Sequence, residues 1–455
     1  MDPFRYKWWA LLGVCILAFT AFLDVTIVNT ALPFIQTALQ ANILQLQWVA
    51  NIFTIILSMT LIALGKFADL WGRKRIFYIG VILFAISAFG AGFSATTPML
   101  VFFRALQALG ASTILVCSTA LLSSVFPEKQ RVRAISIYAG ITGFGLMIGP
   151  FLGGILVGLL GWRWVFWINL PLIVLGLSIC SFSLTAHVHQ KPSTRLDWPG
   201  LFLLILGLGA LMYGIIAGAQ HQWTSPFAWT LLLLGLLSLL LLFILDARRK
   251  NPLLNLSIFK ENLIVLAALS CAFGGVVSTV FMFFDPLYLR ILRNLSPFLI
   301  GLLIAIIPAA QVLISFIFHA LEKRFGVANL LFFAILIAFI AIITHRFLQA
   351  HTPILFLTLP FFLLGINWGL SNAASITAIN HTTPPHKIGE ALGTIMTIWN
   401  ITGSILLATS TAVFHAIETS SSFLPAFHAT VTFNIAFGAL LLISAIWARL
   451  KLQRR

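Results

Sequence analysis

The chain has 455 residues, of which 60% are hydrophobic and only 8% are charged, and its mean hydropathy is +1.05. Soluble domains carry about 25% charged residues, so this composition excludes an ordinary soluble globule. The apolar residues form repeated long runs, which predicts a polytopic α-helical membrane protein. A porin-like barrel is excluded because its segments would be short and alternating.

Fourteen of these runs are each long enough to cross a bilayer core, which takes about 20 helical residues. We expect membrane spans at about residues 8–33, 47–65, 76–94, 98–122, 134–158, 164–184, 198–219, 227–245, 263–289, 298–319, 328–346, 353–376, 391–414 and 428–448. They divide the chain into an N-terminal six-helix half (1–190), two inserted linker helices (191–250) and a C-terminal six-helix half (251–455). The linker spans carry no charged group, which favours lipid-facing helices.

Basic residues are distributed unequally between the two sides of these spans. If the chain starts inside, 22 of its 27 Lys and Arg residues fall in cytoplasmic segments, four fall outside, and Arg104 lies within a span. Such a bias predicts that both termini are cytoplasmic, and it accounts for the net charge of +16 without nucleic acid as a partner. The first run lacks a small-residue cleavage site, so we interpret it as a membrane helix and not as a signal peptide.

An aspartate lies inside the first span, in FLDVTIVNTALPF (22–34). Sixteen residues from Trp8 place Asp24 about 24 Å along a core about 30 Å thick. Thr20 shares its helix face. The opposite face is also polar and carries Thr26, Asn29, Thr30 and Pro33. We therefore expect protein or water, and little lipid, on both sides of this span.

The loop after the second span reads GKFADLWGRKR (65–75). Gly65 and Gly72 permit a tight turn, and an ordinary positive-inside loop is the alternative interpretation. Together with FPEKQRVRA (126–134), it suggests a cytoplasmic gate whose charges stabilise an outward-open state. The charged residues of this gate are Asp69, Arg73, Glu128 and Arg133.

The fourth span contains a cation, Arg104, which costs about 2.5–3.5 kcal/mol there on insertion scales. Arg104 follows Pro98 by about 9 Å of helix and so reaches a depth similar to that of Asp24 from the other side. Burial penalises a charged carboxylate, whereas a nearby guanidinium favours it. We hypothesise that Asp24 carries a coupling proton whose affinity Arg104 tunes. A static salt bridge, and snorkelling of Arg104 to the outer surface, are the alternatives.

In the fifth span, Gly145, Gly149 and Gly153 recur every four residues, next to Gly154 and Pro150. Small residues let membrane helices approach closely, and proline removes a backbone hydrogen bond and bends the helix. This pattern indicates either plain helix packing or a sliding, leak-tight contact.

Other intramembrane polar residues give weaker signals. Glu390 lies beside Lys387, where a capping or loop role is favoured over proton handling. Asp285 is expected at the outer surface, interacting with Arg290 or Arg293. Six residues are candidates to line a substrate cavity, although each is alternatively a helix–helix hydrogen bond: Asn29, Gln107, Gln311, Asn367, Trp399 and Asn400.

Several stretches resemble the major facilitator superfamily. The loop 65–75 is similar to its G-x-x-x-D-x-x-G-R-[KR]-[KR] signature, RALQALGAS (104–112) to its R-x-x-Q-G-x-G motif, and GFGLMIGPFLGG (143–154) to its antiporter motif. The segments LDVTIVNTALP, WRWVFWINLP and NPLLNLSIFK resemble the fourteen-span drug:proton antiporter branch. One departure is Ala108, which stands where the family has glycine and adds a methyl group between the fourth span and its neighbour.

The resemblance implies a twelve-helix core with two linker helices in the plasma (bacterial inner) membrane, and a proton-coupled antiporter that exports amphipathic organic compounds. It also implies that the glycine-rich face of the fifth span meets the second half of the chain, at the thirteenth span. The expected partners are a small-molecule substrate, protons and membrane lipid; whether a periplasmic adaptor takes part stays open. The alternatives are a carrier for a metabolite or siderophore and a non-transporting sensor.

We expect no enzyme activity and no cofactor, with the proton gradient as the driving force, because no G-x-x-x-x-G-K-[ST] nucleotide loop is present. We also expect no metal site. His187 and His189 lie together in a linker but without further ligands, and the four cysteines are scattered through apolar runs.

Overall fold

The computed structural model describes residues 6–184, 198–220, 223–248, 256–383, 388–418 and 422–453. In these ranges, fourteen helical segments are long and apolar enough to cross a membrane, so the predicted all-α, fourteen-span fold is confirmed. The chain divides into two compact units: Met1–Leu196 with Ser296–Ala305, and Asp197–Leu295 with Ile306–Arg455.

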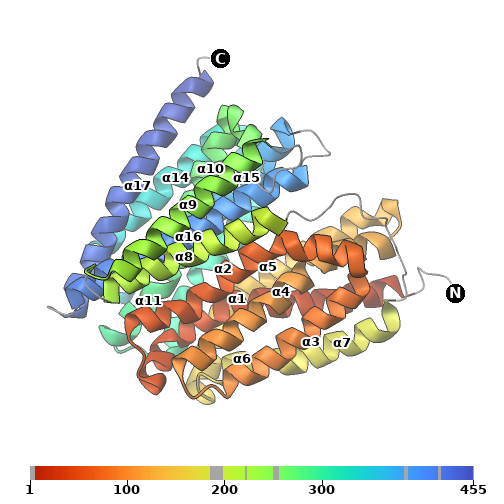
Figure 1. The fold of residues 1–455 in the computed structure, drawn as a ribbon, viewed down its shortest axis with the longest axis horizontal. Coiled ribbons are helices and arrows are strands. Elements are labelled where there is room, and N and C mark those ends of the chain that lie inside the picture. Colours follow the sequence, from red (N-terminus) through yellow and green to blue (C-terminus); the bar gives the residue numbers. More distant parts are fainter. Residues whose placement is uncertain are drawn as a thin grey trace. The chain divides into compact units, whose positions relative to one another are not determined.

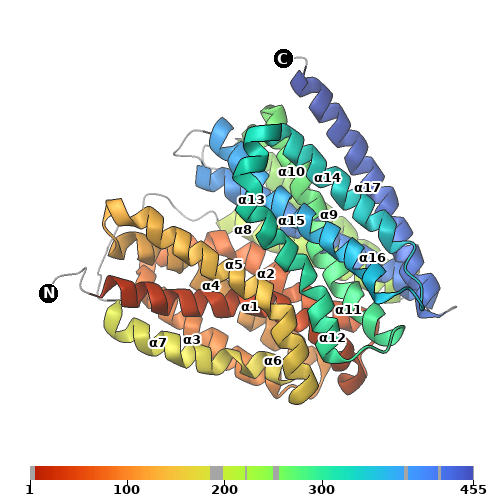
Figure 2. The same ribbon diagram turned by 180° about the vertical axis from the view of Figure 1, so that it is seen from behind.

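The first unit is built around its first helix. Its elements are α1 (Lys7–Leu39), α2 (Ile43–Trp71), α3 (Arg73–Gly92), α4 (Thr97–Val125), α5 (Glu128–Leu159), α6 (Trp164–Trp167), α7 (Asn169–Ser183) and α12 (Pro297–Ile304). Helix α1 packs along α5, α4 and α7 (Figures 1 and 2). Because neighbours surround α1 on several sides, polar residues in its middle are shielded from lipid.

Local sequence signals place the breaks between these helices. Asn42 and Gln45 form a capping box at the start of α2: the Asn42 Oδ1 accepts from Gln45 N at 2.8 Å, and the Gln45 Oε1 accepts from Asn42 N at 3.2 Å. Gly72 has φ +94° and separates α2 from α3, a conformation that glycine adopts without steric cost. The Thr96 hydroxyl accepts from Met99 N at 3.4 Å and caps α4.

The second unit carries the remaining spans. Its elements are α8 (Trp198–Gln220), α9 (Pro226–Arg248), the 3-10 helix η1 (Leu256–Lys260), α10 (Asn262–Val276), the π-helix η2 (Val277–Phe281), α11 (Met282–Ile291), α13 (Ile306–Phe325), α14 (Val327–His345), α15 (Ile354–Thr382), α16 (Ile388–Glu418) and α17 (Phe423–Gln453). Helices α10, η2 and α11 form one continuous span, Asn262–Ile291. The packing partners of α10 are α14, α15, α16 and α17.

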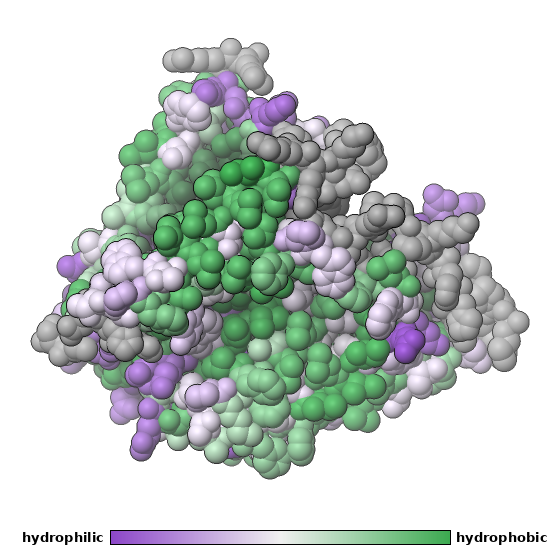
Figure 3. Space-filling model, viewed as in Figure 1, coloured by the Kyte–Doolittle hydropathy of each residue, from purple (hydrophilic) through white to green (hydrophobic). Residues whose placement is uncertain are grey.

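The linker helices differ in exposure. Helix α8 packs between α9 and α16, whereas α9 exposes a row of leucines that includes Leu233, Leu236 and Leu240. Hydrophobic residues cover most of the molecular face in Figure 3, and hydrophilic residues gather near helix ends. This distribution suits lipid contact along the helix sides and water at their ends.

Candidate functional site

The carboxylate of Asp24 lies at the centre of a polar network in the first unit. Asp24 is fully buried on α1. Its Oδ2 forms an ion pair with Arg104 of α4. Its Oδ1 accepts from the Gln107 side-chain amide at 2.9 Å and from the Asn169 amide at 3.0 Å. Two other helices, α4 and α7, therefore supply three donors to one carboxylate in the middle of a membrane span.

Arg104 is held on several sides at once. It is 1% exposed, and its Nη1 also donates to the Oε1 of Gln107 at 2.8 Å. Gln107 lies three residues further along α4 and so shares the helix face of Arg104. The Nε donates to the Val49 carbonyl at 3.4 Å, and the guanidinium lies 4.3 Å from the centre of the Phe53 ring. A buried guanidinium needs several partners of this kind, because a buried charge without a partner is strongly destabilising.

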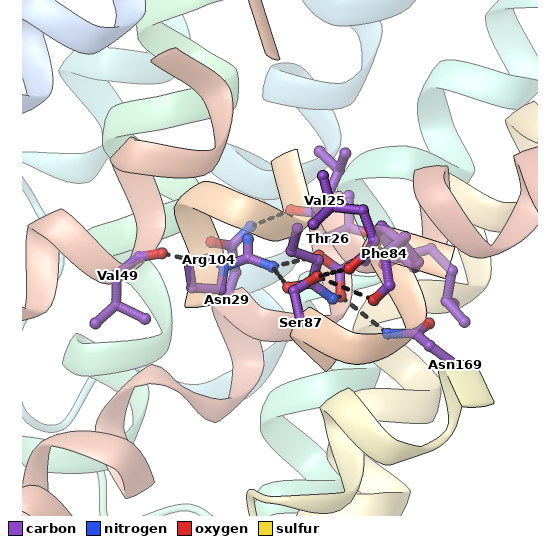
Figure 4. A network of polar contacts seen from close by, with 12 residues as sticks. Val25, Thr26, Asn29, Val49, Phe84, Ser87, Arg104 and Asn169 are labelled. Atoms are coloured by element: carbon purple, nitrogen blue, oxygen red, sulfur yellow. Dashed lines mark hydrogen bonds and ion pairs between the residues drawn. The ribbon is translucent and has the colours of Figure 1, made fainter. Parts of the chain in front are cut away.

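Asn169 is the member of the site that sequence reasoning missed. The short helix α6 turns the chain so that Asn169 begins α7 and its side chain reaches Asp24. In Figure 4, Arg104 lies between Val49 and the rest of the network, and Asn169 approaches from the opposite side. The Oδ1 of Asn169 has no hydrogen-bond partner among the described residues. The only signal was an amide inside the aromatic stretch WRWVFWINLP.

The second polar face of α1 packs against the glycines of α5. The Thr26 hydroxyl donates to the Leu146 carbonyl at 3.0 Å. A Cβ added at Gly145 would lie 2.9 Å from the Phe19 carbonyl oxygen, and one at Gly153 would lie 2.8 Å from the Ile27 carbonyl oxygen. The third glycine of the row, Gly149, also faces α1.

A Cβ added at this third glycine, Gly149, would meet Thr26 and Ile27. The row therefore faces the first span. The expectation of a contact with the thirteenth span is wrong for these glycines, because α1 already fills the space in front of them.

The neighbouring face of α5 meets α12, within the same unit. A Cβ added at Gly154 would come within 2.6 Å of the Pro297 carbonyl oxygen and 2.9 Å of the Gly301 Cα. Pro150 lies inside α5, which continues through it to Leu159. Ala108, the departure from the family motif, is fully buried in the hydrophobic core of the unit.

The predicted gate residues are only partly placed. Gly72 forms the predicted turn, Gly65 faces Val116, and the side chain of Asp69 lies outside the described residues. The remaining three are Arg73, which is half-buried at the start of α3, and Glu128 and Arg133, which are exposed on α5. Arg133 lies over the ring of Trp8 at 5.7 Å, and among the described side chains no ion pair joins it to Glu128.

The predicted cavity residues lie in different surroundings. Gln107 belongs to the Asp24 network, and Gln311 is half-buried on α13. The Trp399 indole donates to Ser278 Oγ at 3.0 Å. The buried Asn367 donates to the Ala334 carbonyl at 3.0 Å. The other two asparagines bond within their own helices: Asn29 to the Val25 carbonyl at 3.4 Å and Asn400 to the Met396 carbonyl at 3.0 Å.

Asp285 corrects another expectation. It is fully buried on α11, where its Oδ1 lies 3.4 Å from the Nε2 of His345, itself fully buried. The prediction of a surface residue interacting with Arg290 or Arg293 is wrong, because neighbouring helices of the second unit cover this end of the span. The Glu390 side chain and the residues Lys387, His187 and His189 lie outside the described part of the chain. No metal-binding cluster occurs among the residues that were described.

Fourteen apolar spans, together with a buried, hydrogen-bonded ion pair inside the first unit, define a polytopic membrane protein of the transporter class, since intramembrane ionisable groups mark substrate and ion pathways. The chain matches the model of the Major Facilitator Superfamily over residues 14–408 and belongs to that family, whose members are transporters and not enzymes.

Three similar proteins illustrate the range of the family. The chain is 34% identical to "Multidrug resistance protein Stp" of Mycobacterium tuberculosis over 68% of its own length, and it spans only 57% of that relative. It is 28% identical to "Riboflavin transporter RibZ" of Clostridioides difficile, covering 95% of this chain and 91% of the relative. A solved peptide transporter in complex with sulfate has a TM-score of 0.72 at 14% identity, covering 98% of this chain and 99% of the other. This last likeness concerns the fold alone.

Proposed function

We propose that the protein is a proton-coupled antiporter that exports amphipathic organic compounds across the plasma membrane, with both termini in the cytoplasm. The observation that carries this proposal is the fully buried Asp24 and its three donors from two other helices. Small-molecule export is supported by the multidrug resistance relative. The proton gradient is the proposed driving force, and no cofactor is needed.

The network offers chemistry for both charge states of Asp24. When ionised, the carboxylate accepts hydrogen bonds from Arg104, Gln107 and Asn169. When protonated, the carboxyl group becomes a donor and no longer forms an ion pair with Arg104. Each state then has its own hydrogen-bond arrangement. A difference of this kind is what a proton needs in order to shift an equilibrium between two conformations.

The test is an efflux screen in membrane vesicles with an imposed pH gradient, over chemically varied compounds. Asp24→Asn keeps the size and hydrogen bonding of the side chain but cannot ionise, so it should lose gradient-driven export. Asp24→Glu should retain part of it with a changed pH profile. Asp246→Asn, on α9, is the matched control for removing a buried carboxylate and should export normally. Equal gradient-driven export by Asp24→Asn and wild type would refute the proposal.

A second candidate is a carrier for a single metabolite. The alignment with the riboflavin transporter favours it, because that relative is matched over 91% of its length. Riboflavin therefore belongs in the same screen. Transport of that one compound, with no competition from amphipathic drugs, would select the second candidate.

A further inference from the structure

The second unit contains a buried acid–base pair that the proposed function does not use. Asp285 on α11 and His345 at the end of α14 are both fully buried, with the Asp285 Oδ1 3.4 Å from the His345 Nε2. The His345 ring lies 4.4 Å from the ring of Phe281 and 6.1 Å from that of Phe361. The pair therefore occupies an apolar, largely aromatic environment.

The hydrogen bonds of His345 define how many protons the pair must hold. Its Nδ1 lies 2.7 Å from the Ala341 carbonyl oxygen. A carbonyl only accepts, so Nδ1 carries a hydrogen and Nε2 is the atom that faces Asp285. Neither carboxylate oxygen of Asp285 has a hydrogen-bond donor among the described residues.

Without a further proton, the lone pair of Nε2 would face an ionised carboxylate that is buried and unpaired, which is strongly unfavourable. One proton between them removes the conflict, either as imidazolium with carboxylate or as imidazole with carboxylic acid. A second proton would leave a buried imidazolium without its counter-charge. The pair is thus built for one exchangeable proton.

Among the described residues, Tyr288, Arg293 and Arg346 are polar or charged groups near this end of the second unit, and each has a partner of its own. The Tyr288 hydroxyl donates to the Gln349 carbonyl at 2.7 Å, and Arg293 donates to the Ala350 carbonyl at 2.6 Å. Arg346 on the loop after α14 pairs with His428 of α17 at 3.0 Å. The neighbouring side chains from η2, α15 and α16 are aromatic: Phe281, Phe361 and, against Phe284, Phe414. His345 is the ionisable side chain that the geometry places against the Asp285 carboxylate, with its Nε2 3.4 Å from Oδ1, while the Tyr288 hydroxyl is directed to Gln349.

The helix around Asp285 is irregular on both sides of it. The π-helix η2 ends at Phe281, four residues before Asp285, and Pro286 follows it inside α11. Single π-turns in α-helices are frequent at functional sites, and proline removes a backbone hydrogen bond. This segment has fewer regular bonds to break than a straight helix, which suits a local rearrangement that admits water to the pair.

The same π-helix is bound to one of the predicted cavity residues. Ser278 of η2 accepts a hydrogen bond from the Trp399 indole at 3.0 Å, and the Trp399 and Trp368 rings lie 6.3 Å apart. Seven residues, about 10 Å of helix, separate Ser278 from Asp285. A change at Trp399 therefore has a short, continuous route to the pair.

We propose that Asp285 and His345 form a second proton-binding site, which gives up one proton to water and takes it back as the η2–α11 segment rearranges. Release leaves the Asp285 carboxylate and a neutral His345 that keeps its Nδ1 hydrogen on Ala341. Uptake restores the paired state. Trp399 modulates this exchange through Ser278.

The test is infrared difference spectroscopy of the purified full-length protein in lipid nanodiscs, between acidic and alkaline buffers and without any substrate. We expect a titrating signal from one carboxyl and one imidazole that disappears in Asp285→Asn and shifts in His345→Gln. The signal should persist in Asp24→Asn. Identical difference spectra for wild type and Asp285→Asn would overturn the proposal. Because no substrate is used, this outcome is independent of the drug-export test.

Two further variants complete the test. The double variant Asp285→Asn/His345→Gln replaces the pair with two amides that can bond to each other, so it should fold and lack the signal. If it folds and keeps the signal, the site is refuted. Ser278→Ala should shift the pH midpoint of the signal, whereas Ser444→Ala, an exposed serine bonded within α17, should not. An unchanged midpoint in Ser278→Ala would refute the link to Trp399.

Discussion

Removal of one donor from the Asp24 network should make the site hold its proton more tightly. Asn169→Leu keeps a side chain of similar size but deletes the 3.0 Å bond from the Asn169 amide to the Asp24 Oδ1. A hydrogen bond to a charged group contributes about 1.5–3 kcal/mol. One pH unit corresponds to about 1.36 kcal/mol, so the loss of this bond should raise the pH midpoint of proton release by about 1–2 units.

The sign follows from which state the bond stabilises. The Asn169 amide donates to the ionised carboxylate, so its removal disfavours that form and the proton leaves only at higher pH. The assay is proton release from purified protein on addition of a transported compound, measured over a series of pH values. Asn434→Leu is the matched control, because Asn434 is also a buried asparagine whose Oδ1 has no partner in the described part of the chain, but it bonds to Ser410 on α16. A midpoint that is unchanged, or that moves equally in the control, would refute the reasoning.

Three further predictions concern packing, topology and the loop after α2. Gly149→Val should lower the thermal unfolding temperature, because overpacking costs about 1–3 kcal/mol, whereas Gly143→Val, with no described atom within 4 Å of its added Cβ, should not. Reporter fusions should place His189 in the cytoplasm and Gln222 outside; the same side for both would remove a span from the topology. Asp69→Asn should impair vesicle transport with normal expression, and a normal transport rate would argue against the gate.

The sequence was informative about the membrane spans and the depth of the ion pair. Span number follows from apolar run length because a bilayer of fixed thickness demands about 20 helical residues. The similar depth of Asp24 and Arg104 followed from a fixed rise per residue counted from both surfaces, whereas the contact between their two helices did not. Asp24 and Arg104 could be identified from the sequence because both are charged, and a charged side chain inside a membrane span is unfavourable unless it has a partner.

The lateral neighbours of each helix could not be read in the same way. Asn169 is uncharged and costs little in a span, so nothing marked it as a partner of Asp24. Depth alone also gave the wrong environment for Asp285. Its position near the end of a span predicted exposure to water, but its burial depends on which helices surround that end. The α5 glycines illustrate the same limit, because the row predicts close packing without naming α1 as the partner.

The ion pair between Asp24 and Arg104 also has an electrical consequence. With Asp24 ionised, the two side chains sum to zero, and the membrane voltage exerts little net force on them. Protonation cancels only the negative member, so the site then carries the single positive charge of Arg104. A unit charge moved across the whole membrane exchanges about 2.3 kcal/mol per 100 mV with the field. The membrane voltage would therefore act on the conformational step in which Asp24 is protonated. If the exported compound is a monovalent cation, the site with Asp24 ionised and the compound bound would also carry one positive charge, so the same voltage would act on the return step.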